Sequence, residues 1–148
     1  MGVSRRLFLR GAAAAAVLMA LPRALLAWPE KAFKANSRDD VMKALFGGTE
    51  ASESSAVVLN APDIAENGRV VPVSVSSTLD GVETIGIIVE ENPSPLAASF
   101  DLGPGAAADV STRLKMGKTS NVIAVVRADG KLYTAQKEVK VTIGGCGG

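Results

Sequence analysis

Val71-Pro72-Val73-Ser74-Val75-Ser76 is the stretch that decides the fold class of this chain, because a valine occupies every second position. A period of two places the valines on one face of a β-strand and the proline and serines on the other. Pro72 cannot donate a ladder hydrogen bond, so we expect this strand at a sheet edge or beside a bulge. The stretch therefore predicts a β-strand with one buried face and one exposed face.

Further runs along the chain repeat this period, and turn signals separate them. The runs are Ile85/Ile87/Val89, Phe100/Leu102, Val110/Thr112/Leu114, Val122/Ala124/Val126 and Val139/Val141/Ile143. Asparagine or aspartate precedes glycine at Asn67-Gly68, Asp80-Gly81 and Asp129-Gly130, and such pairs favour tight turns. About seven short strands with regular turns predict a mainly β fold, an immunoglobulin-like antiparallel β-sandwich. The Cys…Trp…Cys pattern of antibody domains is absent from the sequence, so the likeness is one of architecture.

A short N-terminal helix is the other element that the sequence predicts. Ser37 suits an N-cap position, Asp39-Asp40 would lie in the first turn, and Gly47-Gly48 would end the helix. An apolar stripe runs between these signals at Val41, Ala44 and Leu45. We expect about ten residues of helix that cover the end or the edge of the sheet.

The first 27 residues have the features of an export signal. Arg5 and Arg6 precede an apolar run over residues 11–21, and small residues follow up to Ala27, near which we expect cleavage. That run is too short for a membrane span. Paired arginines before apolar residues are typical of a twin-arginine (Tat) signal, with an ordinary Sec signal as the alternative. We therefore expect a signal peptide (1–27), a helix plus β-sandwich domain (28–143) and a C-terminal arm (144–148).

Composition and charge exclude several classes of function for the mature chain. The 148 residues contain no histidine and one cysteine, so the ligand sets of zinc, haem and iron–sulfur sites are missing, and we expect no metal or cofactor. The signal carries four of the 16 basic residues and no acidic one, which leaves 12 basic against 15 acidic residues. Such a chain lacks the basic surface that nucleic acid or an anionic membrane requires. Export in the folded state is then better explained by assembly with a partner before crossing.

The chain ends in Gly144-Gly145-Cys146-Gly147-Gly148, and Cys146 is its single thiol. A frayed terminus explains the glycines but not the cysteine, because free cysteines are usually buried. The predicted strand over residues 139–143 leads directly into this segment, and from Ile143 an extended backbone carries Cys146 about 10 Å away. We therefore expect a flexible arm in which Cys146 is the site of covalent attachment and the glycines give access to it.

The domain offers this thiol no catalytic assistance that the sequence reveals. A Cys–His pair is impossible without histidine, and thioredoxin-type exchange lacks its second cysteine. We interpret Lys137 and Lys140 as solvated charges on the last strand. Three functions stay open from the residues alone: a non-catalytic covalent carrier, a thiol–disulfide exchange enzyme, and an adhesion or scaffold subunit that is linked to another through Cys146.

Several segments of the sequence resemble a known family. They are Gly144-Gly145-Cys146-Gly147-Gly148, Val139-Lys140-Val141-Thr142, Ala61-Pro62, Ala65-Glu66-Asn67-Gly68, Val71-Pro72-Val73 and Asn92-Pro93. Together with the export signal and the predicted sandwich, they resemble the SoxY family, whose members are sulfur-carrier subunits of the periplasmic Sox thiosulfate-oxidising system. The likeness extends over essentially the whole mature chain, and the glycines around a sole C-terminal cysteine are its most specific feature.

The resemblance implies a carrier without catalytic activity of its own, in which Cys146 bears the sulfur intermediates. A haem-containing partner would join thiosulfate to the Cys146 sulfur as a cysteine S-thiosulfonate, and a hydrolase would then release sulfate. A sulfane dehydrogenase, where present, would oxidise the remaining sulfur. Members of the family form a heterodimer with a SoxZ subunit that has no export signal, so the resemblance also implies a SoxZ-like partner.

Overall fold

The structure of the protein is a computed structural model, and it describes residues 28–142. Within this range two short helices come first and nine strands follow. The helices are α2 (Glu30–Phe33) and α3 (Arg38–Phe46). The strands are β1 (Ser52–Glu53), β2 (Val57–Asn60), β3 (Ile64–Ala65), β4 (Val71–Ser77), β5 (Val82–Val89), β6 (Leu96–Asp101), β7 (Asp109–Leu114), β8 (Ser120–Ala128) and β9 (Lys131–Val141).

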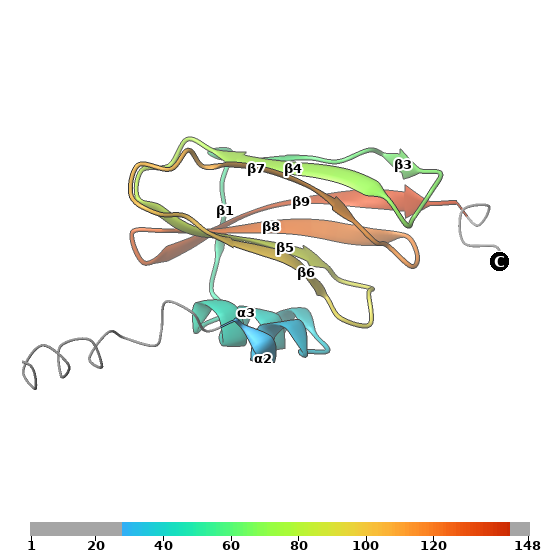
Figure 1. The fold of residues 1–148 in the computed structure, drawn as a ribbon, viewed down its shortest axis with the longest axis horizontal. Coiled ribbons are helices and arrows are strands. Elements are labelled where there is room, and N and C mark those ends of the chain that lie inside the picture. Colours follow the sequence, from blue (N-terminus) through green and yellow to red (C-terminus); the bar gives the residue numbers. More distant parts are fainter. Residues whose placement is uncertain (1–27, 143–148) are drawn as a thin grey trace, which may run out of the picture.

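The strands form two sheets that stack as a β-sandwich (Figure 1). The larger sheet has the order β1-β9-β8-β5-β6, with β3 also paired to β9, and the smaller sheet has the order β2-β4-β7. All pairs among the longer strands are antiparallel, whereas the two-residue strands β1 and β3 join β9 in parallel. The predicted mainly β sandwich with few helices is confirmed.

The alternation of valines in β4 places its apolar side chains in the core between the two sheets. Val71, Val73 and Val75 are at most 3% exposed and belong to one cluster with residues of the larger sheet. Each fully buried aliphatic side chain stabilises the fold by roughly 1.5–3 kcal/mol, so this face drives the sheets together. The inward residues of the two central strands of the larger sheet are Ile85, Ile87, Val89, Val122, Ala124 and Val126, all fully buried.

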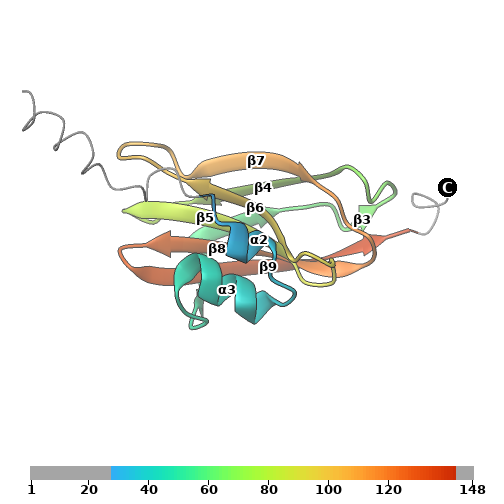
Figure 2. The ribbon, with the colours of Figure 1, turned by 60° about the horizontal axis from the view of Figure 1, so that its bottom comes forward.

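The helices cover the outer face of the larger sheet, as Figure 2 shows, so the predicted position at its end or edge is wrong. The reason lies in residues between the alternating ones: Ile88, Ile123 and Val125 point outward and are also fully buried. β5 and β8 are therefore apolar on both faces and need a second cover. Helix α3 supplies that cover with Val41 and Met42, among others.

Gly86 in β5 allows α3 to approach the sheet closely. A Cβ atom at this position would lie 3.1 Å from Cζ of Phe46 and 3.2 Å from Cδ2 of Leu45, which is tighter than ordinary contact. The C-terminal end of α3 is fixed by Arg127 of β8, whose guanidinium donates to the carbonyl oxygen of Phe46 at 2.6 Å. The same guanidinium lies 5.3 Å from the centroid of the Phe46 ring. These contacts fasten the end of α3 to the sheet.

The predicted ends of α3 are confirmed by its capping geometry. The Ser37 hydroxyl accepts a hydrogen bond from the backbone N–H of Asp40 at 3.2 Å, as expected of an N-cap. Gly47 has φ = 80°, a left-handed conformation that favours glycine and ends the helix.

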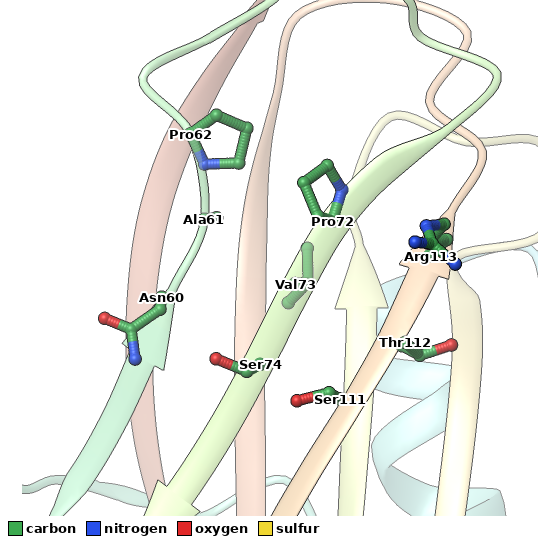
Figure 3. Close-up of a pocket in the computed structure, with 9 residues that line it drawn as sticks. All are labelled: Asn60, Ala61, Pro62, Pro72, Val73, Ser74, Ser111, Thr112 and Arg113. Atoms are coloured by element: carbon green, nitrogen blue, oxygen red, sulfur yellow. The ribbon is translucent and has the colours of Figure 1, made fainter.

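Pro72 lies in the middle strand of the smaller sheet, in a regular register, so the expected edge position or bulge is wrong. The proline is tolerated because β2 ends at Asn60, which pairs with Ser74. Continuing this register would place Pro62 opposite Pro72, and neither proline has an N–H to donate. The two rings face each other across the end of the β2–β4 ladder (Figure 3). The hydrogen-bonded pairing of β2 with β4 therefore ends before the position at which Pro62 and Pro72 would each have to donate a backbone N–H.

Candidate functional site

The predicted attachment residue Cys146 and its neighbours Gly144, Gly145, Gly147 and Gly148 lie outside the described residues, and so do Arg5 and Arg6 of the predicted export signal. The description ends at Thr142, four residues before the cysteine. What the structure describes is the base from which this tail leaves the sandwich. We call the last residues of β9 and the one after it, from Val139 to Thr142, the root of the arm.

The root is held by the β8 side of the larger sheet. Val139 pairs with Ser120 of β8 and is fully buried in the core. Two residues later, the backbone N–H of Val141 donates to Oγ1 of Thr119 at 3.0 Å. A side chain thus continues the contact after the strand ladder has ended. The backbone of the root is therefore fixed on this side almost to the end of the described chain.

The short strand β3 holds the root from the other side. Ile64 pairs with Lys140 and Ala65 with Val141 in a parallel register. Two backbone bonds flank this register, from Lys140 N–H to the Asp63 carbonyl oxygen at 3.0 Å and from Thr142 N–H to the Ala65 carbonyl oxygen at 3.2 Å. Backbone N–H groups paired on both sides of a strand resist local opening.

Lys137 fastens the segment before β3 to β9. Its ammonium group donates to the carbonyl oxygen of Ala61 at 2.6 Å and lies 3.0 Å from a carboxylate oxygen of Asp63. The Lys137 side chain is 36% exposed, so this lysine is a partly solvated charge on the strand that also has two partners, and Lys140 is exposed. Its partners lie about 75 residues earlier in the chain, in the loop between β2 and β3, so no local sequence pattern could predict the contact.

A shallow depression of about 850 Å³ lies on the outer face of the smaller sheet (Figure 3). Its floor includes Pro72 and Ser74 of β4, with Asn60 on one side and Arg113 of β7 on the other. Arg113 is the one charged side chain in this lining, and the lining contains no pair of acid and base.

Metal binding and membrane crossing can each be judged for the described residues. Among residues 28–142, no group of three or more histidine, cysteine, aspartate or glutamate side chains is placed to hold a metal ion. In the same range no helix is long and apolar enough to cross a membrane.

Comparison with known proteins decides the family. The family model described as sulfur oxidation protein SoxY matches residues 42–146, a range that ends at the cysteine itself. The chain belongs to the SoxY family. A solved structure described as the sulfur carrier protein SoxY from Chlorobium limicola f thiosulfatophilum is 48% identical to it, with a TM-score of 0.65. The match covers 71% of this chain and 96% of that one. The chain is thus a sulfur oxidation protein of a carrier family.

The fold alone is shared with proteins of another chemistry. Superoxide reductase (neelaredoxin) from Ignicoccus hospitalis matches with 24% identity and a TM-score of 0.52, over 59% of this chain and 80% of that one. A single-substitution variant of that reductase matches with 22% identity and a TM-score of 0.52, over 81% of this chain and 98% of that one. No curated protein matches the chain. At such identities the likeness concerns the sandwich and carries no information on the reaction.

Proposed function

We propose that this member of the SoxY family is a covalent carrier of sulfur intermediates in thiosulfate oxidation, with Cys146 as the attachment site. The observation that carries the proposal is the family match, which runs through to the chain's only cysteine. The glycines on both sides, Gly144-Gly145 and Gly147-Gly148, leave the sulfur without neighbouring side chains. We expect them to let the arm enter the active sites of several enzymes.

The proposed cycle begins with oxidative attachment. The thiol of Cys146 loses its proton, a bond forms between its sulfur and the outer sulfur of thiosulfate, and two electrons pass to a haem-containing partner. Water then cleaves the terminal sulfonate as sulfate, which leaves a persulfide on the cysteine. A sulfane dehydrogenase, where present, oxidises that outer sulfur, and a second hydrolysis restores the thiol. Every oxidation or hydrolysis is assigned to a partner, so this chain is a substrate-bearing subunit and not an enzyme.

The sequence explains why partner enzymes, and not this chain, would have to activate the thiol. An unassisted thiol has a pKa near 8.5, so only a few per cent is thiolate at neutral pH. No histidine exists in the chain to act as a base, and no second cysteine exists to resolve a disulfide. Partner enzymes therefore have to supply the activation. A carrier gains from an unreactive resting thiol, because it does not react before a partner engages it.

The proposal extends to the organisation and location of the chain. Residues 1–27 would direct export to the periplasm through the Tat pathway, with Arg5 and Arg6 as the recognised pair. Residues 28–143 would form the carrier domain and residues 144–148 its arm. We further propose a heterodimer with a SoxZ-like subunit, because the Tat route carries folded proteins and this chain has no ligand set for a cofactor that would require it.

Intact-mass analysis of the protein from cells that oxidise thiosulfate tests the proposal. We expect mass additions that correspond to sulfur and sulfonate groups on the unmodified chain and none on Cys146→Ser. The variant should keep the thermal stability and partner content of the unmodified protein, and cells that carry it should no longer oxidise thiosulfate. A single permanent Cys146 disulfide dimer, with no sulfur adducts, would support a scaffold role and contradict the carrier function.

A further inference from the structure

The two ends of the sandwich carry charge of opposite sign. Figure 1 shows the root of the arm and β3 at one end of the long axis and the β8–β9 turn at the other. We call the first the root end, which also includes the loops before β4 and β8, and the second the far end. Strand β9 alone runs from one end to the other, and its 11 residues span about 35 Å. This length is several times the Debye length of about 8 Å at physiological salt, so each end acts separately on whatever approaches it.

The root end has an excess of basic side chains that no neighbour neutralises. Within residues 28–142 no side-chain hydrogen bond or ion pair is formed by the exposed Arg69, Arg113, Lys115 and Lys140. The acidic side chains at this end that are likewise unpaired are Glu66 and Glu138. Lys118 is excluded from this count, because its ammonium group lies 2.8 Å from a carboxylate oxygen of Glu91. The free charge of the root end is therefore positive.

The far end is acidic, by contrast. Exposed acidic residues lie in or beside the turns that follow β4, β6 and β8, and they are Asp80, Glu83, Asp101, Asp109 and Asp129. None of the five forms an ion pair within residues 28–142. Lys131 is the single basic residue of these turns. The domain is thus a long body with its positive end at the arm, although 15 acidic residues outnumber 12 basic ones over residues 28–142.

The basic side chains of the root end stand on segments that are joined to one another. The backbone N–H of Met116 donates to the carbonyl oxygen of Gly68 at 2.6 Å, which joins the segment of Lys115 to the loop that carries Arg69. On the other side, Lys140 pairs with Ile64 of β3. The charges are therefore held in fixed positions around the root.

Two exposed apolar side chains lie among these charges. Ile64 is 57% exposed and Val70 is 48% exposed, although large apolar side chains are rarely so open elsewhere in the described residues. We define the collar as Ile64, Arg69, Val70, Lys115 and Lys140. Apolar groups beside arginine are typical of protein interfaces, whereas a purely electrostatic surface would not need them.

We propose that the collar is the docking surface for partner enzymes whose active-site entrance is bordered by carboxylates. The inference rests on the proposed function, because it requires enzymes that visit Cys146. Carboxylates attract the root end and repel the far end, so the carrier approaches with its arm first. The apolar side chains then prolong the contact once it has formed. An extended polyanion fits less well, because it would attract the collar but repel the rest of a net-negative domain.

Charge reversal at the two ends tests the steering. Biolayer interferometry measures the association rate constant of the mature protein, with any co-purifying subunit retained, on the immobilised haem-containing partner. Thiosulfate is omitted, so no adduct forms. The rate constant of the unmodified protein should fall at least about tenfold between about 20 and about 300 mM NaCl. Lys115→Glu should lower it about fivefold at the lower salt concentration. Lys131→Glu makes the same change of charge at the far end and should not lower it.

A second matched pair tests the apolar part of the collar. Val70→Gln should raise the Kd about threefold through faster dissociation, whereas Val58→Gln, at a valine of β2 that is 44% exposed, should leave it unchanged. Circular dichroism verifies that each variant is folded.

Three results would overturn the collar as a docking surface. They are equal association rates of Lys115→Glu and Lys131→Glu, a rate that does not depend on salt, and binding to phosphatidylglycerol vesicles that Lys115→Glu abolishes, which would assign the collar to a membrane. The proposed function is judged separately, by the mass of the adducts on Cys146. Adducts together with any of these three results would leave the carrier function intact and remove the collar alone. Absence of adducts would remove the carrier function and, with it, the enzymes that the collar is proposed to bind.

Discussion

Replacing Lys137 with methionine tests whether the root of the arm is held as the structure describes. Methionine keeps the aliphatic length of the side chain but removes its charge and its donor. The change takes away the 2.6 Å hydrogen bond to the Ala61 carbonyl oxygen and the 3.0 Å ion pair with Asp63. Lys140→Met is the matched control, because Lys140 is exposed and has no side-chain partner among the described residues.

The expected loss of stability follows from the exposure of the groups involved. A hydrogen bond from a charged donor contributes about 1.5–3 kcal/mol when it is well shielded. Here Lys137 is 36% exposed and Asp63 is 88% exposed, so the ion pair itself adds little. We therefore expect Lys137→Met to lower the free energy of unfolding by about 1 kcal/mol, and Lys140→Met to change it by less than about 0.5 kcal/mol. For a domain of this size the first value lowers Tm by about 4 °C.

Hydrogen exchange locates the effect. The N–H groups of Lys140 and Thr142 donate to β3 and the residue before it, so both should exchange faster in Lys137→Met than in the control, by about fivefold for a local loss of 1 kcal/mol. Amides in the centre of β8 should follow only the global change. Equal exchange at the root in the two variants would refute the idea that Lys137 holds β3 in place. Equal unfolding free energies would refute the assigned magnitude.

Two other substitutions separate packing from access. A Cβ atom at position 86 would lie only 3.1 Å from Phe46 and 3.2 Å from Leu45, and Gly86→Val adds two further carbons there. We expect this overpacking to lower the free energy of unfolding by up to about 3 kcal/mol, as measured by urea denaturation. An unchanged urea midpoint would contradict the close contact between α3 and β5. On the proposed function, Gly145→Val should slow the modification of Cys146 in an assay with purified partner enzymes and leave Tm unaltered, and equal rates would count against the need for a bare backbone beside the thiol.

The parts of the fold that the sequence predicted are those whose signal is local. The alternation in β4 is set by the two-residue repeat of a strand, and the buried Val71, Val73 and Val75 confirm it. The predicted turn at Asp129-Gly130 joins β8 and β9, and both residues have positive φ, 48° and 73°. Aspartate and glycine tolerate this conformation better than most residues, so the turn could be predicted from the pair alone.

What the sequence did not predict depends on residues far apart in the chain. In an alternating strand the outward positions should be polar, but Ile88 and Ile123 occupy outward positions and are apolar. They therefore indicate that the outer face of the larger sheet is covered. The cover itself comes from a helix about 40 residues before β5. Strand β3 has two residues and no period of its own, so neither this strand nor the contact of Lys137 with the loop before it could be recognised without the fold.

The fixed root sets the range within which the proposed chemistry has to occur. From Thr142 to Cys146 the chain has four residues, which span at most about 14 Å when fully extended. Because β3 and Thr119 hold the backbone up to Thr142, this reach is measured from one defined point on the sandwich. On the proposed function, every partner must therefore bring its catalytic centre to this end of the domain. Recognition by several unrelated enzymes can then rest on the same few residues around the root.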